Sequence, residues 1–230
     1  MSYYIVLSLG LIVSFVFCLR RARGFSVSNL IFKSVSSLCY LLTAVFALLD
    51  NSDAYIYGSL IIFGGALGLC GDFVLDLKGL YKEHESIYLR TGFIFFLIGH
   101  LFYSGAIIYN TQIRWWQALI CFGVAVIFAV LNNASAKIMK VHFGAYRRIV
   151  FLYVVFLALT MILSIAAVIL SQFEKRYIIL AIGAILFTLS DAILSGTFFG
   201  RNKDGKGYLF INHFFYYAGQ YLIAASIMFM

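Results

Sequence analysis

The stretch Gly64–Gly79, GGALGLCGDFVLDLKG, places two carboxylates, Asp72 and Asp76, one helical turn apart at the end of an apolar run. An ionised carboxylate in a lipid-spanning helix costs roughly 2.5 to 3.5 kcal/mol even on lenient insertion scales. A side chain with that cost usually has a task or a partner that offsets it. Asp72 is therefore the first candidate functional residue.

The composition excludes an ordinary soluble globule. Hydrophobic residues make up 63% of the 230 positions and charged residues only 11%, whereas about a quarter of the residues in a soluble domain are charged. The formal net charge of +8 raises the question of nucleic acid, but in a membrane protein the position of the charges matters more than their sum. The four cysteines fall in separate apolar runs without metal-ligand spacing, so we expect buried thiols rather than a metal or redox site.

Apolar runs of spanning length, about twenty residues each, organise the whole chain. Since the connections between them are short and proline is absent, we predict one all-α membrane domain, 1–230, of eight continuous transmembrane helices. The runs lie at roughly 2–19, 30–49, 54–77, 88–110, 115–131, 148–171, 177–199 and 208–230.

The basic residues are distributed unevenly between the two sides of the predicted membrane domain. Fourteen Lys and Arg residues follow or flank spans one, three, five and seven, against three (Arg114, Lys175 and Arg176) on the other side. The positive-inside rule therefore predicts that both termini face away from the cytoplasm. We expect a bacterial inner membrane, because the chain is compact and has no obvious sorting tail.

The Asp72 motif occurs a second time. ALGLCGDFVL (66–75) aligns with ILFTLSDAIL (185–194), which places Asp191 119 residues after Asp72. His100 and Gln220, each preceded by glycine, are 120 residues apart. Two features at nearly one offset predict two parallel four-helix repeats, about 1–110 and 115–230, and such repeats would bring the two aspartates into one cavity.

Helical spacing predicts further polar side chains near the depth of Asp72 and Asp191 in the membrane. At 1.5 Å per residue, Asp72 lies roughly 9 Å and Asp191 roughly 15 Å from the basic boundary, both in the cytoplasmic half. Several neighbours also have a structural interpretation. Asp76 could be a solvated helix-end charge, and Lys33 could snorkel to the head groups unless it pairs with an aspartate of the site or with lipid phosphate. His100 could form an interhelical hydrogen bond, and Gln220 and Tyr216 could pack between helices. The candidate residues are Asp72, Asp76, Asp191, His100, Tyr103, Ser190, Tyr216, Gln220, Lys33 and Lys78.

Four short motifs occur in order along the chain. They are Gly71-Asp72 with Leu75, Phe96-Leu97-Ile98-Gly99-His100 with Tyr103, Ser190-Asp191 with Leu194, and Tyr216-Tyr217 with Gln220-Tyr221-Leu222-Ile223. Together they resemble the YhhN-type lysoplasmalogenase family, and the resemblance covers nearly the whole chain. One departure is that the family's second helix tends to begin with Lys-Pro, whereas Lys33 is followed by Ser34.

This resemblance implies hydrolysis of the vinyl ether bond of a lysoplasmalogen to a fatty aldehyde and a glycerophospho-choline or -ethanolamine. Acid-catalysed opening of a vinyl ether needs one protonated acid and one negative group near an oxocarbenium ion, as in glycosidases. Two carboxylates in an apolar cavity supply both forms, so we expect Asp72 and Asp191 to be the catalytic pair without assigning which is the acid.

Under the hydrolase hypothesis we expect the remaining candidates to orient or hold the substrate. We expect His100, Gln220, Tyr216, Tyr103 and Ser190 to orient water or the ether oxygen. Lys33, Asp76 and Lys78 would lie at the rim, where a lysine can hold the phosphate. The expected partners are a lysophospholipid substrate and membrane lipid, with no nucleic acid, no cofactor and no metal.

Two other classes of function are compatible with the same helices. A proton-coupled transporter could use facing carboxylates in parallel repeats, although confinement of the acids to one half of the membrane counts against it. A non-catalytic lipid-binding or scaffold protein would have no reason to pair the acids. An asparagine at position 72 should abolish turnover in an enzyme but leave lipid binding largely intact in a binding module.

Overall fold

The computed structural model describes residues 2–22, 24–136, 138, 140–200 and 205–230. Within these ranges the chain contains α-helices and single 3-10 turns and no strand, as predicted. The helices are α1 (Ser2–Arg21), α2 (Val27–Asp50), α3 (Tyr55–Leu80), α4 (Glu85–Thr111), α5 (Trp115–Ser135), α6 (Arg147–Leu170), α7 (Lys175–Phe199) and α8 (Lys206–Ser226).

Seven of the described helices, α1 to α7, are long and apolar enough to cross a membrane, and the chain is a multi-pass membrane protein. The expectation of eight spans is met in helix number, but α8 falls short in hydropathy. The reason is its content of polar side chains, among them Asn212, His213 and Gln220. All three are buried, so the polarity of α8 faces the protein interior.

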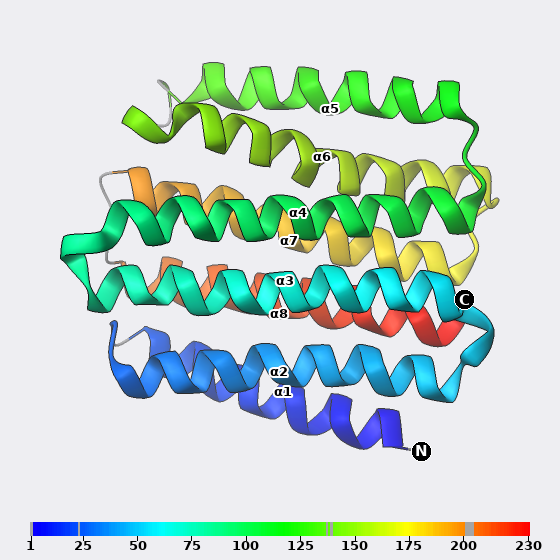
Figure 1. Cartoon of the computed structure of the whole chain (residues 1–230), viewed down its shortest axis with the longest axis horizontal. Helices are drawn as coiled ribbons and strands as arrows, with labels where there is room; N and C mark the ends of the chain where they lie inside the picture. Colours follow the sequence, from blue (N-terminus) through cyan, green and yellow to red (C-terminus); the bar gives the residue numbers. More distant parts are fainter. Residues whose placement is uncertain (1, 23, 137, 139, 201–204) are drawn as a thin grey trace.

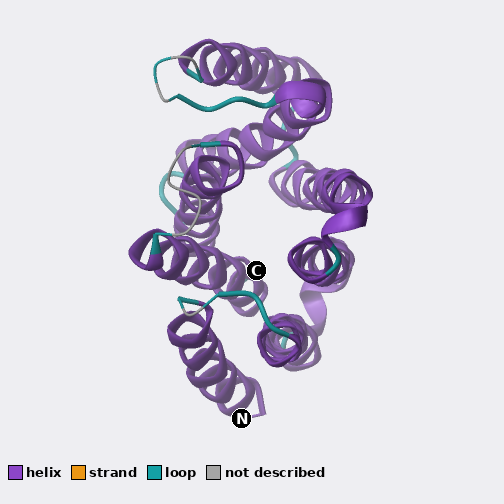
Figure 2. Cartoon of the chain, turned by 90° about the vertical axis from the view of Figure 1, so that its left-hand side faces the viewer, coloured by secondary structure: helices purple, strands orange, loops and turns teal. Residues whose placement is uncertain are grey.

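The helices run side by side along the long axis of the molecule, and both termini lie at the same end (Figure 1). Viewed along the helices, they form two rows, with α2, α3 and α4 in one and α1, α8, α7 and α6 in the other (Figure 2). Helix α5 packs on α6 at the edge. The interior between the rows holds the candidate site.

The surface of the bundle is the reverse of that of a soluble protein. Large apolar side chains such as Ile12, Ile31, Phe63 and Ile127 are more than half exposed, and similar residues cover every helix. Polar and charged side chains such as Asp72 are instead buried. Because contiguous exposed apolar surface of this extent is unfavourable in water, the outer surface fits a hydrocarbon environment.

The second helix begins well before Lys33. Ser26 is its N-cap, with extended backbone, and the Ser26 hydroxyl accepts a hydrogen bond from the Asn29 amide at 3.1 Å. Lys33 is therefore an interior residue of α2. The replacement of the family's proline by Ser34 leaves this helix start intact.

Two helix pairs cross at matching glycines. In the α3–α4 pair, a Cβ on Gly99 would lie 3.0 Å from the Gly64 carbonyl oxygen. In the α7–α8 pair, a Cβ on Gly219 would lie 2.8 Å from the Gly183 carbonyl oxygen. These glycines are separated by 119 and 120 residues, like the polar residues of the duplicated motif, while the duplication itself stays a prediction.

The membrane orientation inferred from the uneven distribution of Lys and Arg stays a prediction. Both termini lie at the end opposite the α1–α2, α3–α4 and α5–α6 connections (Figure 1), as an even number of helices requires. Four of the fourteen basic residues counted above, Arg23, Lys137, Arg201 and Lys203, lie outside the described residues.

The glycine crossing yields a test of the packing. We expect Gly219→Ala to lower the unfolding temperature in detergent by several degrees, because the new methyl group would meet the Gly183 oxygen and the Phe187 nitrogen, both backbone atoms that cannot move aside. Overpacking of this kind costs about 1 to 3 kcal/mol. Gly123→Ala is the matched control, since nothing lies within 4 Å of its added methyl group. Equal shifts for the two variants would contradict the close crossing.

Candidate active site

The two aspartates of the duplicated motif line the same internal cavity. Asp72 comes from α3 and Asp191 from α7, and the cavity between them has a volume of about 40 Å³, enough for a few water molecules. Apolar and aromatic side chains form most of its wall. Its other lining residues include Leu75, Phe93, Phe96, Leu194, Phe198, Leu209 and Tyr216.

Asp72 is held by three groups that favour its charged form. The hydroxyls of Ser37 and Tyr216 both donate to Asp72 Oδ2 at 2.6 Å. The Lys33 ammonium lies 3.2 Å from Asp72 Oδ1. Asp72 is 3% exposed, so these contacts replace water as its solvation. A carboxylate with two short hydrogen bonds and an adjacent cation is suited to remain an anion.

Asp76 is part of the same cluster, and its interpretation as a solvated helix-end charge is wrong. Arg21 donates to both carboxylate oxygens, at 2.9 and 3.0 Å, and Lys33 donates to Oδ1 at 3.0 Å. All three side chains are buried. The cause is that α2 packs between α1 and α3, so Lys33 of α2 and Arg21 at the end of α1 both reach Asp76.

Lys33 does not snorkel to the membrane surface. Its ammonium bridges Asp72 and Asp76, and the residue is 5% exposed. The alternative of pairing with a site aspartate is therefore the one that the structure adopts. Arg21, which the sequence showed only as a basic residue at the end of the first span, completes two positive and two negative charges in one buried cluster.

Asp191 has different neighbours. The Tyr153 hydroxyl donates a hydrogen bond to Asp191 Oδ2, and Ser190 Oγ lies 3.4 Å from Oδ1. No cation forms an ion pair with Asp191 among the described residues. The two aspartates thus share a cavity but not an electrostatic environment.

Tyr153 was missed by the sequence reasoning, although two signals point to it. It is the only tyrosine in the predicted sixth span, 148–171. It is also the seventh residue of α6, and Lys33 is the seventh residue of α2, 120 residues earlier. Extending the repeat to these helices would have placed Tyr153 beside Asp191, just as Lys33 lies beside Asp72.

Residues 28–227 match the model of the YhhN family. The chain belongs to the YhhN family. The match covers every helix of the site except α1, which supplies Arg21. Neither a curated protein nor a solved structure shows significant similarity to the chain.

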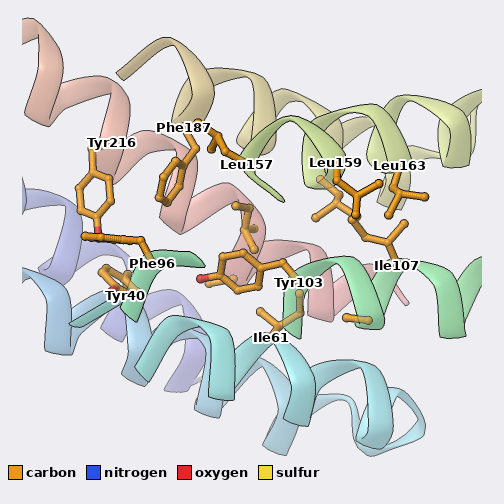
Figure 3. Close-up of a cluster of buried hydrophobic side chains, with 14 of the residues drawn as sticks. Tyr40, Ile61, Phe96, Tyr103, Ile107, Leu157, Leu159, Leu163, Phe187 and Tyr216 are labelled. Atoms are coloured by element: carbon orange, nitrogen blue, oxygen red, sulfur yellow. The ribbon is translucent and has the colours of Figure 1, made fainter. Parts of the chain in front are cut away.

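In this YhhN protein, a line of hydrogen bonds leads away from Asp72 into the bundle. Tyr103 donates to Gln220 Oε1 at 2.9 Å, and Gln220 Nε2 donates to the Tyr216 oxygen at 3.3 Å. Tyr216 in turn donates to Asp72. Tyr103 and Gln220 therefore act on the site through Tyr216 and do not line its cavity. In Figure 3 the aromatic side chains of Phe96 and Phe187 lie near Tyr216, and their ring centroids are 6.2 and 5.2 Å from its own.

His100 lies outside the cavity. Its Nδ1 is 3.1 Å from Thr160 Oγ1 on α6, and its ring packs against Phe187 with centroids 4.8 Å apart. The interhelical hydrogen bond that was its structural interpretation is present. His100 is not among the residues around the aspartates, so direct orientation of water by His100 has no support here.

Ser190 and Lys78 occupy the edges of the site. Ser190 lines the cavity, and its carbonyl accepts a 2.6 Å hydrogen bond from Asn212 of α8. Lys78 lies outside the inner cavity, with its ammonium 3.0 Å from the centroid of the Phe198 ring. Among the described residues, no three His, Cys, Asp or Glu side chains are grouped so that they could hold a metal ion.

The buried charge cluster predicts a large stability difference between adjacent arginines. We expect Arg21→Met to destabilise the protein by about 3 to 5 kcal/mol, because it leaves Asp76 buried with an incomplete set of partners. Arg20→Met should cost less than about 1 kcal/mol, because Arg20 bonds Ser28 in an exposed position. Thermal unfolding in one detergent compares the two.

A double variant separates charge imbalance from lost packing. Arg21→Met combined with Asp76→Leu removes one positive and one negative charge and leaves Lys33 paired with Asp72. We expect this variant to regain part of the lost stability. A double variant no more stable than Arg21→Met alone would contradict the electrostatic account.

Proposed function

We propose that this YhhN-family protein is a lysoplasmalogenase-like hydrolase that cleaves the vinyl ether bond of a lysoplasmalogen. The observation that carries the proposal is the pair Asp72 and Asp191, which line one cavity in an apolar wall but have different partners. Membership of the family supports the class of reaction. On the basis of the distribution of Lys and Arg we propose that the site lies in the cytoplasmic half of the membrane, and a bacterial inner membrane remains our expectation.

The different partners suggest which carboxylate is the acid. Asp72 has Lys33 beside it and accepts two short hydrogen bonds, which all stabilise the anion. Asp191 lies in the same apolar cavity with only hydroxyl partners among the described residues, so its protonated form is favoured by desolvation. Asp191 is therefore assigned as the proton donor and Asp72 as the anionic stabiliser and base.

The reaction then proceeds with a closed proton balance. Protonated Asp191 delivers its proton to the outer alkene carbon, which leaves an oxocarbenium ion at the carbon bonded to oxygen. Asp72 stabilises this cation and takes a proton from the water that adds to it. In the resulting hemiacetal, Asp191 removes the hydroxyl proton while Asp72 protonates the departing glycerol oxygen. The fatty aldehyde and the glycerophospho-choline or -ethanolamine are released, and both carboxyl groups return to their starting forms.

A neighbouring cavity offers a place for the first carbons of the aliphatic chain. It has a volume of about 60 Å³, lies among α5, α6 and α7, and shares Tyr153 and Asp191 with the inner cavity. Its wall includes Phe128, Val150 and Leu157. An alkenyl chain entering here would place its double bond beside Asp191 while the rest of the chain extends towards lipid.

The first test is aldehyde release by the purified protein in detergent from an alkenyl lysophospholipid, with the saturated alkyl ether as the inert analogue. We expect Asp72→Asn and Asp191→Asn each to reduce kcat by about 10²- to 10⁴-fold, as loss of an acid–base group does. Asp53→Asn, at an exposed position in the α2–α3 connection, is the control and should keep full activity.

The outcome separates the functional classes. Activity retained by both active-site variants would rule out the two-carboxylate mechanism. If no alkenyl lipid yields aldehyde, the hydrolase proposal fails for this substrate class, and proton-coupled flux in proteoliposomes becomes the measurement for the transporter alternative.

Tyr153 provides a test of the acid assignment. Tyr153→Phe removes the hydroxyl that donates to Asp191 and keeps the ring that packs against Phe93. We expect kcat to fall by roughly tenfold and the pH–rate profile to move, because the hydrogen bond that positions the donor carboxyl is lost. Ser37→Ala is the matched change on Asp72. An unchanged pH–rate profile in Tyr153→Phe would contradict the role assigned to Asp191.

A further inference from the structure

A third and larger cavity lies next to the inner one. It has a volume of about 360 Å³ and is bounded by the ends of α3 and α7 and the start of α4 and α8. Phe25, Phe198 and Leu209 line both cavities, so the two are separated by shared side chains. We call the larger cavity the vestibule; its other lining residues are Lys78, Gly79, Lys82, Glu85 and Thr197.

The cations of the inner cavity are already neutralised by protein carboxylates. Arg21 is bidentate to Asp76, and Lys33 bridges Asp76 and Asp72. An anion that approached these two cations would meet the two aspartates as well. A negatively charged part of a ligand therefore has to find its counter-charge elsewhere.

Lys78 has the properties of such a counter-charge. It is 8% exposed, and its ammonium lies 3.0 Å from the centroid of the Phe198 ring. Within the described part of the chain, no carboxylate comes within ion-pair distance of it and no hydrogen bond satisfies it, although the exposed Glu85 carboxylate lines the same vestibule. An aromatic face attracts a cation but supplies no hydrogen-bond acceptor for the three N–H groups. A largely desolvated ammonium of this kind favours a bound anion.

We propose that the vestibule binds the phosphodiester of the lysolipid head group, with the Lys78 ammonium as its main counter-charge. The inference rests on the proposed function. Lys82, exposed at the rim of the same cavity, adds a second and more strongly screened positive charge. This assigns the phosphate to Lys78 and withdraws it from Lys33.

The dimensions of the substrate agree with this assignment. In a lysoplasmalogen, six bonds separate phosphorus from the vinyl carbon bonded to oxygen. This corresponds to roughly 7 to 8 Å when extended, because bonds of about 1.5 Å at tetrahedral angles each advance the chain by about 1.25 Å. Lys78 follows Asp72 by six residues in the same helix, a rise of roughly 9 Å. A phosphate in the vestibule thus allows the vinyl ether to reach the aspartates.

The kinetic test compares two vinyl ether substrates, an alkenyl glycerophosphoethanolamine and the alkenylglycerol that lacks phosphate. We expect Lys78→Met to raise KM for the phosphate-bearing substrate by roughly 10- to 100-fold, with little change in kcat and little change for the alkenylglycerol. Lys78→Arg should restore most of the affinity. An equal rise in KM for both substrates, or a fall in kcat alone, would overturn the assignment.

A binding test does not depend on turnover. The saturated alkyl glycerophosphoethanolamine is titrated into the detergent-solubilised protein, with the alkylglycerol and inorganic phosphate as separate probes. We expect Lys78→Met to weaken binding of the phospholipid probe at least tenfold. Lys175→Met should leave binding unchanged, because the Lys175 ammonium also lies over an aromatic ring, that of Phe229 at 4.7 Å, but at the opposite end of the bundle.

The two tests distinguish the possible failures. Lys78-dependent binding without aldehyde release would refute the hydrolase and support the head-group site. Aldehyde release with binding that is indifferent to Lys78 would refute the site and support the hydrolase. Inorganic phosphate that binds as tightly as the phospholipid probe would make the vestibule a site for the free anion and would overturn its assignment to a lipid head group.

Discussion

One buried ammonium, that of Lys33, holds the first half of the site together. It lies between Asp72 and Asp76, and Arg21 neutralises the second of these from α1. Each of these charges alone would be costly in a hydrocarbon environment. Grouped as two cations and two anions they can be buried together, which ties α1, α2 and α3 to one arrangement. With Lys33 in place, Asp72 has an adjacent cation and two hydroxyl donors, which favour its charged form.

The positions that the predicted duplication makes equivalent carry different side chains. In α2 the seventh residue is Lys33, which faces Asp72; in α6 the seventh residue is Tyr153, which faces Asp191. A lysine stabilises a carboxylate, whereas a tyrosine hydroxyl also tolerates a protonated carboxyl group as its partner. Two related carboxyl groups can therefore keep distinct protonation states through their fixed neighbours. Fixed partners that differ are sufficient for this, without repulsion between the two carboxylates.

Periodicity and motif spacing were sufficient to predict the helices and the shared cavity of Asp72 and Asp191, because both depend on position along a continuous helix. Periodicity and spacing were not sufficient to predict that Asp76, Lys33 and Arg21 lie together in one buried cluster. A charged side chain near a helix end can face water or be buried in the protein interior. Which of the two occurs depends on the neighbouring helix that faces it. His100 shows the same limit: its spacing matches that of Gln220, yet Gln220 bonds Tyr216 of the site whereas the His100 ring bonds Thr160 on α6. Interhelical packing, which no single-helix pattern contains, decides such cases.

The weak hydropathy of α8 follows from the polar groups that the site requires. A site that stabilises an anion in lipid needs hydroxyl and amide groups. Helix α8 supplies Tyr216, which donates to Asp72, and Gln220, which donates to Tyr216. A helix with this many polar groups is a poor membrane span by itself. Helix α8 is instead covered by α1, α2 and α7, so its polar face meets protein and only its apolar face meets lipid. The apolar helices around α8 thus provide the environment in which this polar helix can be buried. Packing against these helices, rather than the hydropathy of α8 itself, keeps its polar groups within the membrane.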